Sequence, residues 1–551
     1  MNFGFIIDNR KCIGCHACTV ACKAEHNVPV GVNRTWVKYV EKGQYPHTRR
    51  LFSVMRCNHC EDAPCVEICP VQALFIREDG IVDFDKRRCI GCKACTQACP
   101  YDALYIDPET HTAAKCNYCA HRIDIGLEPA CVNVCPEHAI ISGDLDDPNS
   151  EISRLMAREQ VSARKVEKGT RPKLFYIDGD EASLTPVATS PATEYMWSSQ
   201  GAGVGHYARY AERLLAQADP VALAKKLSDA EESALREEIA RAGVIIPEEG
   251  DQAGLLQKAI QVVRENARRV YDAPSKGVMW GWQVSAYVWT KALAAGAFLI
   301  PFFYQQFHLM PISQATVLTG LLTGLVFLAI TGVLLIIDLD RPARFAYVLL
   351  RPQWRSWLVK GGYSITLFGA LLTLGLLNAL IRGGLGNTLG WLTALLAVIT
   401  AAYTAFLFAQ ARGRDFWQSP VLPVHMLVHA LMAGAAFFAL MGLLRPENAA
   451  WNAYLRLALG LLLLVNLIVL AIELGVPHPT LDAKKTVRSI VTGRFAVAFW
   501  LGSLVAGHLV PLVLVWLGGS IPMAVAGALV LLGMYATEHI WVRAPQLIPL
   551  S

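Results

Sequence analysis

The chain has 551 residues, a formal net charge of +5 and a composition of 54% hydrophobic and only 17% charged residues. This composition excludes a disordered chain, and the apolar runs that begin near residue 284 exclude a soluble globular enzyme. The net charge is small for this length, so we expect no nucleic-acid partner.

The N-terminal residues MNFGFIIDNRKCIGC contain no basic segment followed by an apolar core. We therefore predict that the chain has no secretory signal peptide. No twin-arginine motif precedes Cys12 either. The cysteine-rich segment is thus expected either in the cytoplasm or on the outside, carried there by an exported partner.

All 16 cysteines lie between Cys12 and Cys135, in four groups of four. The groups are Cys12, Cys15, Cys18 and Cys22; Cys57, Cys60, Cys65 and Cys69; Cys89, Cys92, Cys95 and Cys99; and Cys116, Cys119, Cys131 and Cys135. The first and third have the spacing C-x2-C-x2-C-x3-C, which is typical of two-cluster ferredoxins because three close thiolates can hold one 4Fe-4S cube. Zinc sites and a disulfide framework are the alternatives, and both fit this spacing poorly. We predict that the 16 thiolates hold four 4Fe-4S clusters.

An internal repeat supports this assignment. CIGCHACTVAC at Cys12 recurs as CIGCKACTQACP at Cys89, and CNHC at Cys57 recurs as CNYC at Cys116. One ferredoxin-like unit is thus duplicated, and we expect pseudo-twofold symmetry with two clusters in each unit. Proline follows the last cysteine of three groups, whereas Lys23 follows Cys22, which makes the ligand role of Cys22 less marked.

Short strand-like runs lie between the cysteine groups, for example from Leu74 to Phe84, where an Asp-Gly pair marks a hairpin turn. We predict an α+β duplicated ferredoxin-like domain over residues 1–180, with little hydrophobic core of its own. A row of one-electron centres moves electrons between two distant sites, and this half contains neither a Gly-rich phosphate loop nor a nucleophile triad. Its predicted function is electron transfer.

Residues 181–280 are predicted to be a polar linker. From Tyr207 to Tyr271 the pattern indicates amphipathic helices, for example LLQKAIQVVRENARRV. We expect these helices to be a spacer that packs on the soluble domain or on a partner. A helix lying on the membrane surface is the alternative.

Residues 281–551 are predicted to form an all-α bundle of eight transmembrane helices. The apolar runs begin near Val284, Ala315, Gly362, Leu389, Pro420, Leu455, Phe495 and Ile521. The loops on the side of the cysteine domain contain twelve Lys and Arg residues and those on the other side three. This bias predicts a multi-pass protein of the inner (cytoplasmic) membrane, with the cysteine domain facing the cytoplasm.

Polar residues inside these helices are candidate functional groups because their burial in lipid is costly. Lys291, Tyr403 and His425 all fall near the cluster-side ends of their predicted helices. We predict that these three contact a quinone or supply its protons, since a quinone carbonyl needs a hydrogen-bond donor and reduction consumes protons. The alternatives are that Lys291 extends to the interface, that Tyr403 is an interfacial anchor, and that His425 only bonds a neighbouring helix.

Asp338, Glu473 and His508 are predicted members of a proton relay in the same bundle. Haem is the rival use of histidine, but His425 and His429 lie on one face of one helix, and His508 is expected toward the opposite leaflet. We therefore expect no haem.

The cysteine pattern over Met1 to Asp180 resembles the electron-transfer subunit of the DMSO reductase family of molybdenum and tungsten enzymes. From Trp280 to Trp541 the chain resembles the NrfD or polysulfide-reductase membrane subunit. DLDRPARFAYVLLRPQWRSW from Asp338, SPVLP from Ser419 and ELGVPHPTLDA from Glu473 carry this second likeness. Such subunits are usually separate chains, whereas here they are fused.

The first resemblance implies how the cysteines are shared among the clusters. The implied sets are Cys12, Cys15 and Cys18 with Cys135; Cys116, Cys119 and Cys131 with Cys22; Cys89, Cys92 and Cys95 with Cys69; and Cys57, Cys60 and Cys65 with Cys99. The cluster of the third group would lie nearest the membrane.

The second resemblance implies a haem-free site for menaquinone or ubiquinone below that cluster, which we expect between the first, fourth and fifth helices. Together the two likenesses imply a separate catalytic subunit with a bis-pterin (bis-MGD) molybdenum or tungsten cofactor. A redox-driven proton pump, a multihaem cytochrome partner and a bundle that is only an anchor are the alternatives. A dimer of such complexes is left open.

Overall fold

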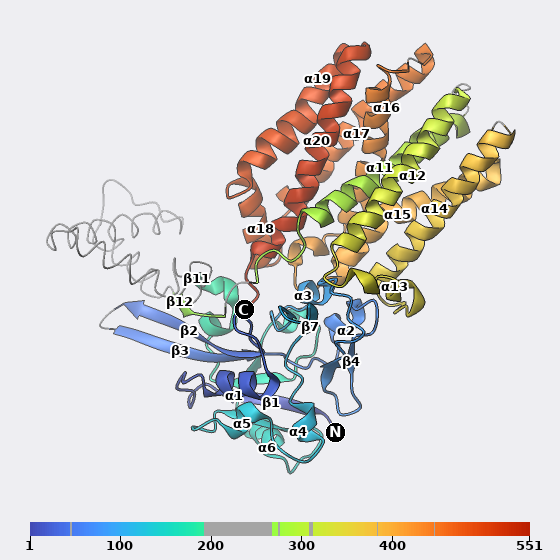
Figure 1. Cartoon of the computed structure of the whole chain (residues 1–551). Coiled ribbons are helices and arrows are strands. Elements are labelled where there is room, and N and C mark those ends of the chain that lie inside the picture. Colours follow the sequence, from blue (N-terminus) through green and yellow to red (C-terminus); the bar gives the residue numbers. More distant parts are fainter. Residues whose placement is uncertain (45–46, 192–266, 274–275, 308–311, 383, 446) are drawn as a thin grey trace, which may run out of the picture.

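The structure is a computed structural model that describes residues 1–44, 47–191, 267–273, 276–307, 312–382, 384–445 and 447–551. A cysteine-rich half with small sheets lies below a bundle of long helices (Figure 1). The amphipathic helices expected between Tyr207 and residue 266 lie outside the described residues.

The sheet nearest the N-terminus closes the far end of the cysteine-rich half. It contains β1 (Phe3–Asp8), β8 (Ile140–Asp144), β9 (Val161–Ala163) and β10 (Leu174–Ile177), in the order β8-β1-β10-β9. β1 pairs with β10 in parallel and with β8 in antiparallel register. Phe5, Ile7 and Leu174 are at most 1% exposed, because alternate residues of the strands face the cluster-binding loops.

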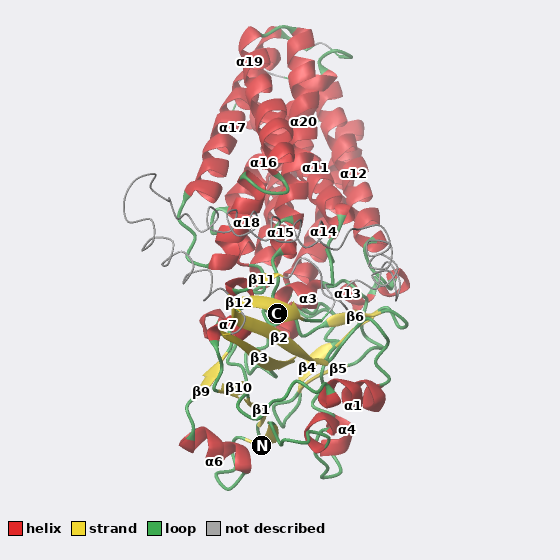
Figure 2. Cartoon of the chain, turned by 90° about the vertical axis from the view of Figure 1, so that its left-hand side faces the viewer, coloured by secondary structure: helices red, strands yellow, loops and turns green. Residues whose placement is uncertain are grey.

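A second sheet lies closer to the membrane helices (Figure 2). It contains β2 (Thr35–Gln44), β3 (His47–Arg56), β11 (Ser190–Pro191) and β12 (Ala267–Tyr271), in the order β11-β12-β2-β3. Here the helix predicted up to Tyr271 is wrong at its end, since Ala267–Tyr271 is a strand. Pairing with β2 satisfies its backbone groups and buries Ala267 and Arg269 on one face, so tertiary pairing overrides the helical pattern.

The cysteine groups lie on short helices and loops between two hairpins. These elements are α1 (Ala17–His26), α2 (Pro64–Ile68), β4 (Leu74–Ile76), β5 (Val82–Phe84), α3 (Ala94–Ala98), β6 (Tyr105–Asp107), β7 (Thr112–Ala114), α4 (Ala120–Ile123) and α5 (Ala130–Asn133). β4 pairs with β5 across the predicted Asp79-Gly80 turn, which confirms that hairpin. The expected α+β architecture of this half is thereby confirmed.

The internal repeat is visible in the backbone. Matched positions of the first and third groups have left-handed φ values, namely 71° at Gly14 and 70° at Gly91, and 61° at His16 and 60° at Lys93. Left-handed backbone is rare for residues other than glycine, so its recurrence at matched positions marks one motif used twice.

The spatial units differ from the sequence repeat. α2 packs against α3, and α1 packs against α5. The second and third groups therefore form one unit, and the first and fourth groups form the other. The expectation that each sequence repeat carries its own two clusters is corrected, because the chain returns to pack its last group beside its first.

Eight helices of the described chain are long and apolar enough to cross a membrane, which confirms the predicted number. They are α11 (Trp282–Gln306), α12 (Gln314–Ile337), α14 (Trp357–Arg382), α15 (Asn387–Gln410), α16 (Leu422–Met441), α17 (Ala449–Gly475), the π-helix η6 (Ala498–Leu509) continued by α19 (Val510–Leu517), and α20 (Ser520–Arg543). Glycines bring two pairs of these helices into close contact: a Cβ on Gly296 of α11 would lie 1.8 Å from Ala430 O of α16, and one on Gly533 of α20 would lie 2.2 Å from Gly507 Cα of η6.

The two halves are joined by backbone hydrogen bonds. Asp340 N donates to Gly91 O at 3.3 Å, Arg341 N to Ile90 O at 3.2 Å, and Gly413 N to Gln97 O at 3.2 Å. The segment that begins at Asp338 is thus a docking segment for the third cysteine group. This arrangement places that group, at the boundary marked by α3 in Figure 1, against the membrane helices, as the resemblance implied.

Candidate functional site

Two of the implied cysteine sets each line a single cavity. Cys69, Cys89, Cys92 and Cys95 line one of them. Cys12, Cys15, Cys18 and Cys135 line the other. Each cavity is therefore bounded by three thiols of one group and the last thiol of another, as in a dicluster ferredoxin.

The other two sets are brought together by buried thiols that interact with one another. Burial raises the pKa of Cys22, and the charges of Cys116, Cys131 and Cys119 raise it further. Cys60 and Cys65 have raised pKa values because of burial and because both lie near Cys57 and Cys99. Such thiols become thiolates by binding a metal, since coordination supplies the positive charge that burial denies them.

The four sets follow one another from the membrane outward. Cys95 of the set nearest the membrane interacts with Cys65 of the next, and Cys57 of that set interacts with Cys116 of the third. Cys18 of the outermost set interacts with Cys131 of the third. The arrangement is a chain of four sites rather than a compact group, which is the geometry that stepwise electron transfer requires.

The surroundings of the sulfur atoms fit iron-sulfur clusters. All 16 cysteines are free of disulfide bonds. Backbone amides donate to several sulfurs, among them Ala73 N to Cys69 Sγ at 3.2 Å and Ala139 N to Cys135 Sγ at 3.3 Å. Amide donors of this kind stabilise the negative charge of a thiolate-bound cluster.

Two buried cations lie close to the cysteine sets. Arg56 is 0% exposed, and its Nη1 donates to Cys131 Sγ at 3.1 Å. Lys115 is also 0% exposed and donates to Cys116 O at 2.8 Å. A buried cation needs a negative partner, and here the thiolates of the cysteine sets provide it.

The absence of proline after Cys22 has a structural consequence. α1 continues past Cys22 to His26, whose Nε2 lies 3.1 Å from Cys119 Sγ. Cys22 itself is 5% exposed and lies within its implied set. Its departure from the proline pattern therefore lengthens the helix and leaves the position of the sulfur unchanged.

A cavity of about 210 Å³ lies between the third cysteine group and the membrane helices. Cys92 and Ile90 line it from the cysteine-rich half, and residues of α11, α12, α14 and α15 line it from the membrane half, among them Tyr287, Asp338 and Tyr403. Trp280 closes one wall, where its Nε1 donates to Cys92 O at 3.1 Å. Most of the lining is apolar, with a few polar groups converging on it, which is typical of a ligand site.

Tyr403 and Lys291 are brought together at this cavity. Lys291 Nζ lies 4.3 Å from the centre of the Tyr403 ring and donates to Thr404 Oγ1. Lys291 is 1% exposed, so its ammonium group does not extend to the interface. Gly361 of α14 makes room for the tyrosine, because a Cβ there would lie 2.1 Å from the Tyr403 ring.

Asp338 follows the last residue of α12 at the boundary between the halves. Burial raises the pKa of its carboxyl to about 6, and the nearby Lys93 opposes this shift. Lys93 also donates to Asp338 O at 2.9 Å and pairs with Asp340 at 3.1 Å. Asp338 is therefore an acid beside the cavity whose pKa lies closer to neutral than that of an exposed aspartate.

The structure does not bring His425 to this cavity. His425 Nδ1 lies 2.6 Å from Glu473 Oε2, and Trp541 Nε1 donates to the same oxygen at 3.1 Å. The cavity lies between α11, α12, α14 and α15, whereas we expected the quinone between the first, fourth and fifth helices, which are α11, α15 and α16. The pairing with Glu473 turns His425 toward α17 instead.

The structure buries His508 inside the bundle, beside Asn466. Asn466 Nδ2 lies 2.7 Å from His508 Nε2 and 3.2 Å from His429 Nε2. His508 therefore belongs to the same buried group as His429.

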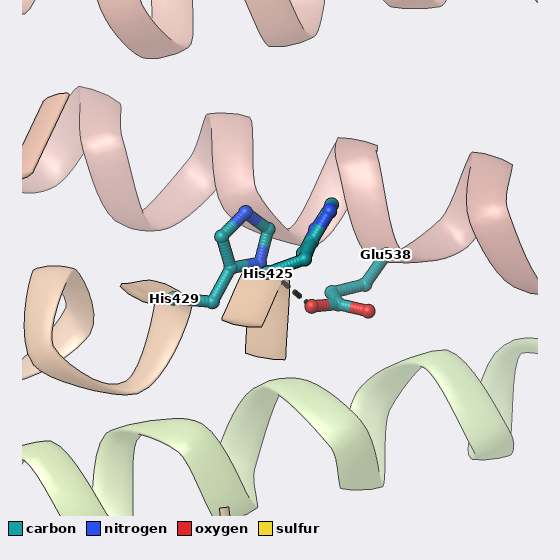
Figure 3. A group of neighbouring side chains, drawn as sticks. All are labelled: His425, His429 and Glu538. Atoms are coloured by element: carbon teal, nitrogen blue, oxygen red, sulfur yellow. Dashed lines mark hydrogen bonds and ion pairs between the residues drawn. The ribbon is translucent and has the colours of Figure 1, made fainter. Parts of the chain in front are cut away.

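Three residues of this region were missed by sequence analysis. Tyr287 interacts with Tyr403 and Thr404, and Glu538 Oε1 lies 2.7 Å from His429 Nδ1. Figure 3 shows Glu538 reaching from α20 toward the two imidazoles of α16. Glu538 could have been found as an ionisable residue in the last apolar run, and Tyr287 as the residue one turn before Lys291. For Asn466 the sequence offers no signal beyond its polarity.

Comparisons with known families support both halves. Residues 272–549 match the family profile described as polysulphide reductase, NrfD. Residues 11–74 and 48–145 match two profiles, each described as a 4Fe-4S dicluster domain. The cysteine-rich half therefore holds 4Fe-4S clusters, and the chain is a multi-pass membrane protein.

Individual proteins match the cysteine-rich half. The chain is 47% identical to the B subunit of tetrathionate reductase from Salmonella typhimurium over 190 residues, which are 34% of this chain and 76% of that protein. It is 43% identical to the B subunit of polysulfide reductase from Wolinella succinogenes over 187 residues, 33% of this chain and 97% of that protein. A putative dimethyl sulfoxide reductase iron-sulfur subunit of Halobacterium salinarum is 39% identical over 215 residues, 34% of this chain and 82% of that protein.

Proposed function

This chain is a member of the polysulphide reductase NrfD family, with 4Fe-4S dicluster domains in the same polypeptide, and we propose that it relays electrons between a catalytic partner subunit and membrane quinone. Four clusters held by the four cysteine sets supply one-electron carriers along the chain. The residues of the membrane half bind the quinone, orient it and exchange its protons.

The single observation that carries this proposal is the position of the cavity. Cys92 of the set nearest the membrane and Tyr403 of the membrane half line the same space. A quinone there would lie next to an electron carrier with no intervening domain. Tyr403 and Tyr287 offer hydroxyl donors to its carbonyl oxygens, and Asp338 can exchange a proton with it.

The opposite end of the cysteine row supports a docking place for the partner. Cys15 is exposed, and the apolar side chains of Ile13 and Val20 on the same loop and helix are 55% and 64% exposed. Exposed apolar residues beside an electron carrier are typical of an interface between subunits. Relatives named as B subunits of reductases support the presence of a catalytic partner, which we place at this end.

Tyr403→Phe tests the quinone site. In the purified complex, reoxidation of prereduced clusters by added quinone should slow roughly tenfold to a hundredfold, because the hydroxyl donor is lost. The control is Tyr454→Phe on α17, whose hydroxyl donates to Ile300 O at 3.4 Å, because neither of these two residues lines the cavity. Reoxidation of the Tyr403 variant at the rate of the unaltered protein would remove the cavity from the mechanism.

We further propose that the partner carries a bis-pterin molybdenum or tungsten cofactor, on the strength of the resemblance to DMSO reductase family subunits. A multihaem cytochrome partner is the competing proposal. Metal analysis of the purified complex separates them: molybdenum or tungsten supports the first, and covalent haem without either metal supports the second.

The cysteine-rich half is proposed to face the cytoplasm, because twelve Lys and Arg residues lie in the loops on its side against three on the other. The C-terminus lies on this side as well, since Arg164 Nη2 donates to Leu550 O at 3.0 Å. A fluorescent protein fused after Ser551 should fluoresce in cells if the proposal holds. A fusion that remains dark at normal expression contradicts it.

A further inference from the structure

Two His–Glu pairs lie side by side inside the membrane bundle. His425 Nδ1 is 2.6 Å from Glu473 Oε2, and His429 Nδ1 is 2.7 Å from Glu538 Oε1. Figure 3 shows the two imidazoles close to each other, and their ring centres are 4.1 Å apart. All four side chains are at most 4% exposed. Ionisable groups are costly at such depth, and where they occur they mark ion or proton pathways.

One end of this group opens toward the cluster side. Glu473 lines a pocket of about 600 Å³ formed by the loops that follow α15 and α17, together with Lys168 and Asp415. Its rim includes exposed residues such as Gln418 and Pro477. The pocket therefore connects the first carboxylate of the group with the solution beside the cysteine-rich half.

Glu473 is placed to pass a proton inward. Its Oε2 is held by His425, while within the described residues its Oε1 has no hydrogen-bond partner and is buried. Nε2 of His425 is likewise unpartnered in the part of the chain that the structure describes. A proton from the pocket can therefore bind Oε1 of Glu473. Oε2 of Glu473 can pass a proton to Nδ1 of His425, and Nε2 of His425 can release one farther inward. Each group thus has one atom that accepts a proton and another that releases one.

The other end of the group reaches the quinone cavity. One ring nitrogen each of His425 and His429 and one oxygen of Glu538 lie within 4.8 Å of one another. Glu538 in turn interacts electrostatically with Lys291. Lys291 contacts the ring of Tyr403, which lines the cavity.

His508 lies beside the two His–Glu pairs but does not exchange protons with them. His508 Nδ1 lies 2.8 Å from the carbonyl oxygen of Ser503, so Nδ1 carries the hydrogen and Nε2 accepts. The amide of Asn466 then donates to Nε2 of both His508 and His429. An amide neither gains nor loses a proton near neutral pH, so Asn466 separates His508 from the pairs.

We propose that Glu473, His425, His429, Glu538 and Lys291 form the proton route between the cluster-side solution and the quinone cavity. The route rests on the proposed quinone site and adds to it the side of the membrane from which the protons come. Each quinone that takes two electrons from the clusters takes two protons along this route and leaves as quinol. Quinol oxidation returns the same two protons to the same side.

The direct test uses the full complex in vesicles with the cysteine-rich half facing outward. Reduced viologen supplies electrons to the clusters, and pH-sensitive dyes report on the outer solution and on the lumen. We expect about two protons to disappear from the outer solution for each quinone reduced, and none from the lumen. Proton loss from the lumen would overturn the proposal and would support a route across the membrane instead.

Glu473→Gln tests the first member of the route. Quinone reduction should fall roughly tenfold to a hundredfold, cluster spectra should stay unchanged, and a small permeant weak acid should restore part of the rate. The matched control is Glu447→Gln on the far side, where Ser313 Oγ donates to that carboxylate at 2.5 Å. If the Glu473 variant does not fold, Glu473→Asp keeps the acid and should keep most of the rate.

The rates of the Tyr403 and Glu473 variants, taken together, distinguish failure of the proton route from failure of the quinone site. If Tyr403→Phe slows quinone reduction and Glu473→Gln leaves it within twofold of the unaltered rate, the cavity stands and the route is wrong. If neither variant slows it, the proposed quinone site fails as well.

Discussion

The two halves of the protein bury charged groups in different ways. In the cysteine-rich half, Arg56 is fully buried beside the sulfur of Cys131, and Lys115 is fully buried and interacts with the thiol of Cys57. Fixed cations thus face groups that become negative when metal binds. In the membrane half, buried imidazoles face carboxylates, and either member of each pair can hold the proton. A side chain that stays positively charged suits a site that exchanges electrons, whereas a pair that can gain or lose a proton suits a site that exchanges protons. The halves meet at one cavity, where both are needed.

Of the changes that test this difference between the halves, loss of a cluster ligand should have the largest effect on activity. Cys95→Ser removes a buried ligand of the set nearest the membrane, so we expect a loss of about four of roughly sixteen irons and no measurable quinone reduction. Iron analysis and low-temperature paramagnetic spectra measure the first, and quinone assays the second. The neighbouring substitution Thr96→Ser should change neither. A Cys95 variant with a full iron content would remove it from the ligand set.

Breaking one His–Glu pair should cost less but still be severe. Glu538→Ala leaves His429 buried without its partner, which lowers the free energy of unfolding by about 3–5 kcal/mol. Replacing both His429 and Glu538 with leucine should restore most of that stability while quinone reduction stays slow. Thermal unfolding in detergent, compared with turnover, separates the two effects. Full turnover in the double variant would show that the pair serves stability alone.

Removing a fixed cation should alter redox properties more than stability. Arg56 holds positive charge beside Cys131, and positive charge favours the reduced, more negative cluster. Arg56→Met should therefore lower the midpoint potential of that cluster by on the order of 100 mV. Arg56→Lys keeps the charge and should shift it less. Redox titration followed by paramagnetic resonance measures both, and equal potentials in all three proteins would contradict this role.

The smallest effect is expected at the boundary between the halves. Burial raises the pKa of Asp338 to about 6, so the folded protein binds this proton more tightly than the unfolded chain does. The carboxyl therefore contributes stability at low pH, and that contribution is lost as the pH rises toward 6. Asp338→Asn should remove this loss and stabilise the protein by up to about 2 kcal/mol at pH 8, with little change at pH 4. Melting temperatures at the two pH values test it, and a larger gain at pH 4 would contradict the sign.

The features that could be predicted from the sequence are those set by residues close together in the chain. The spacing of the cysteines predicted four 4Fe-4S clusters, and the resemblance that the cysteine pattern carries implied ligand sets that the fold brings together. Three thiols of each set lie within one segment of at most 16 residues. The apolar runs predicted eight helices, since the length of a helix is set by the thickness of the lipid. Lys291 and Tyr403 were found because both are polar residues within such runs.

What the sequence by itself determined, then, is the chemistry of each segment: cluster-binding loops, membrane-spanning helices and the polar residues buried in them. Only the tertiary structure decided which of these meet. It placed the cavity against α12 and α14 rather than α16, joined His508 to His429 through Asn466, and turned Ala267–Tyr271 into a strand. These outcomes depend on contacts between residues far apart in the chain. Such contacts do not change the hydrophobic periodicity of the segments that make them, so a sequence pattern cannot reveal them.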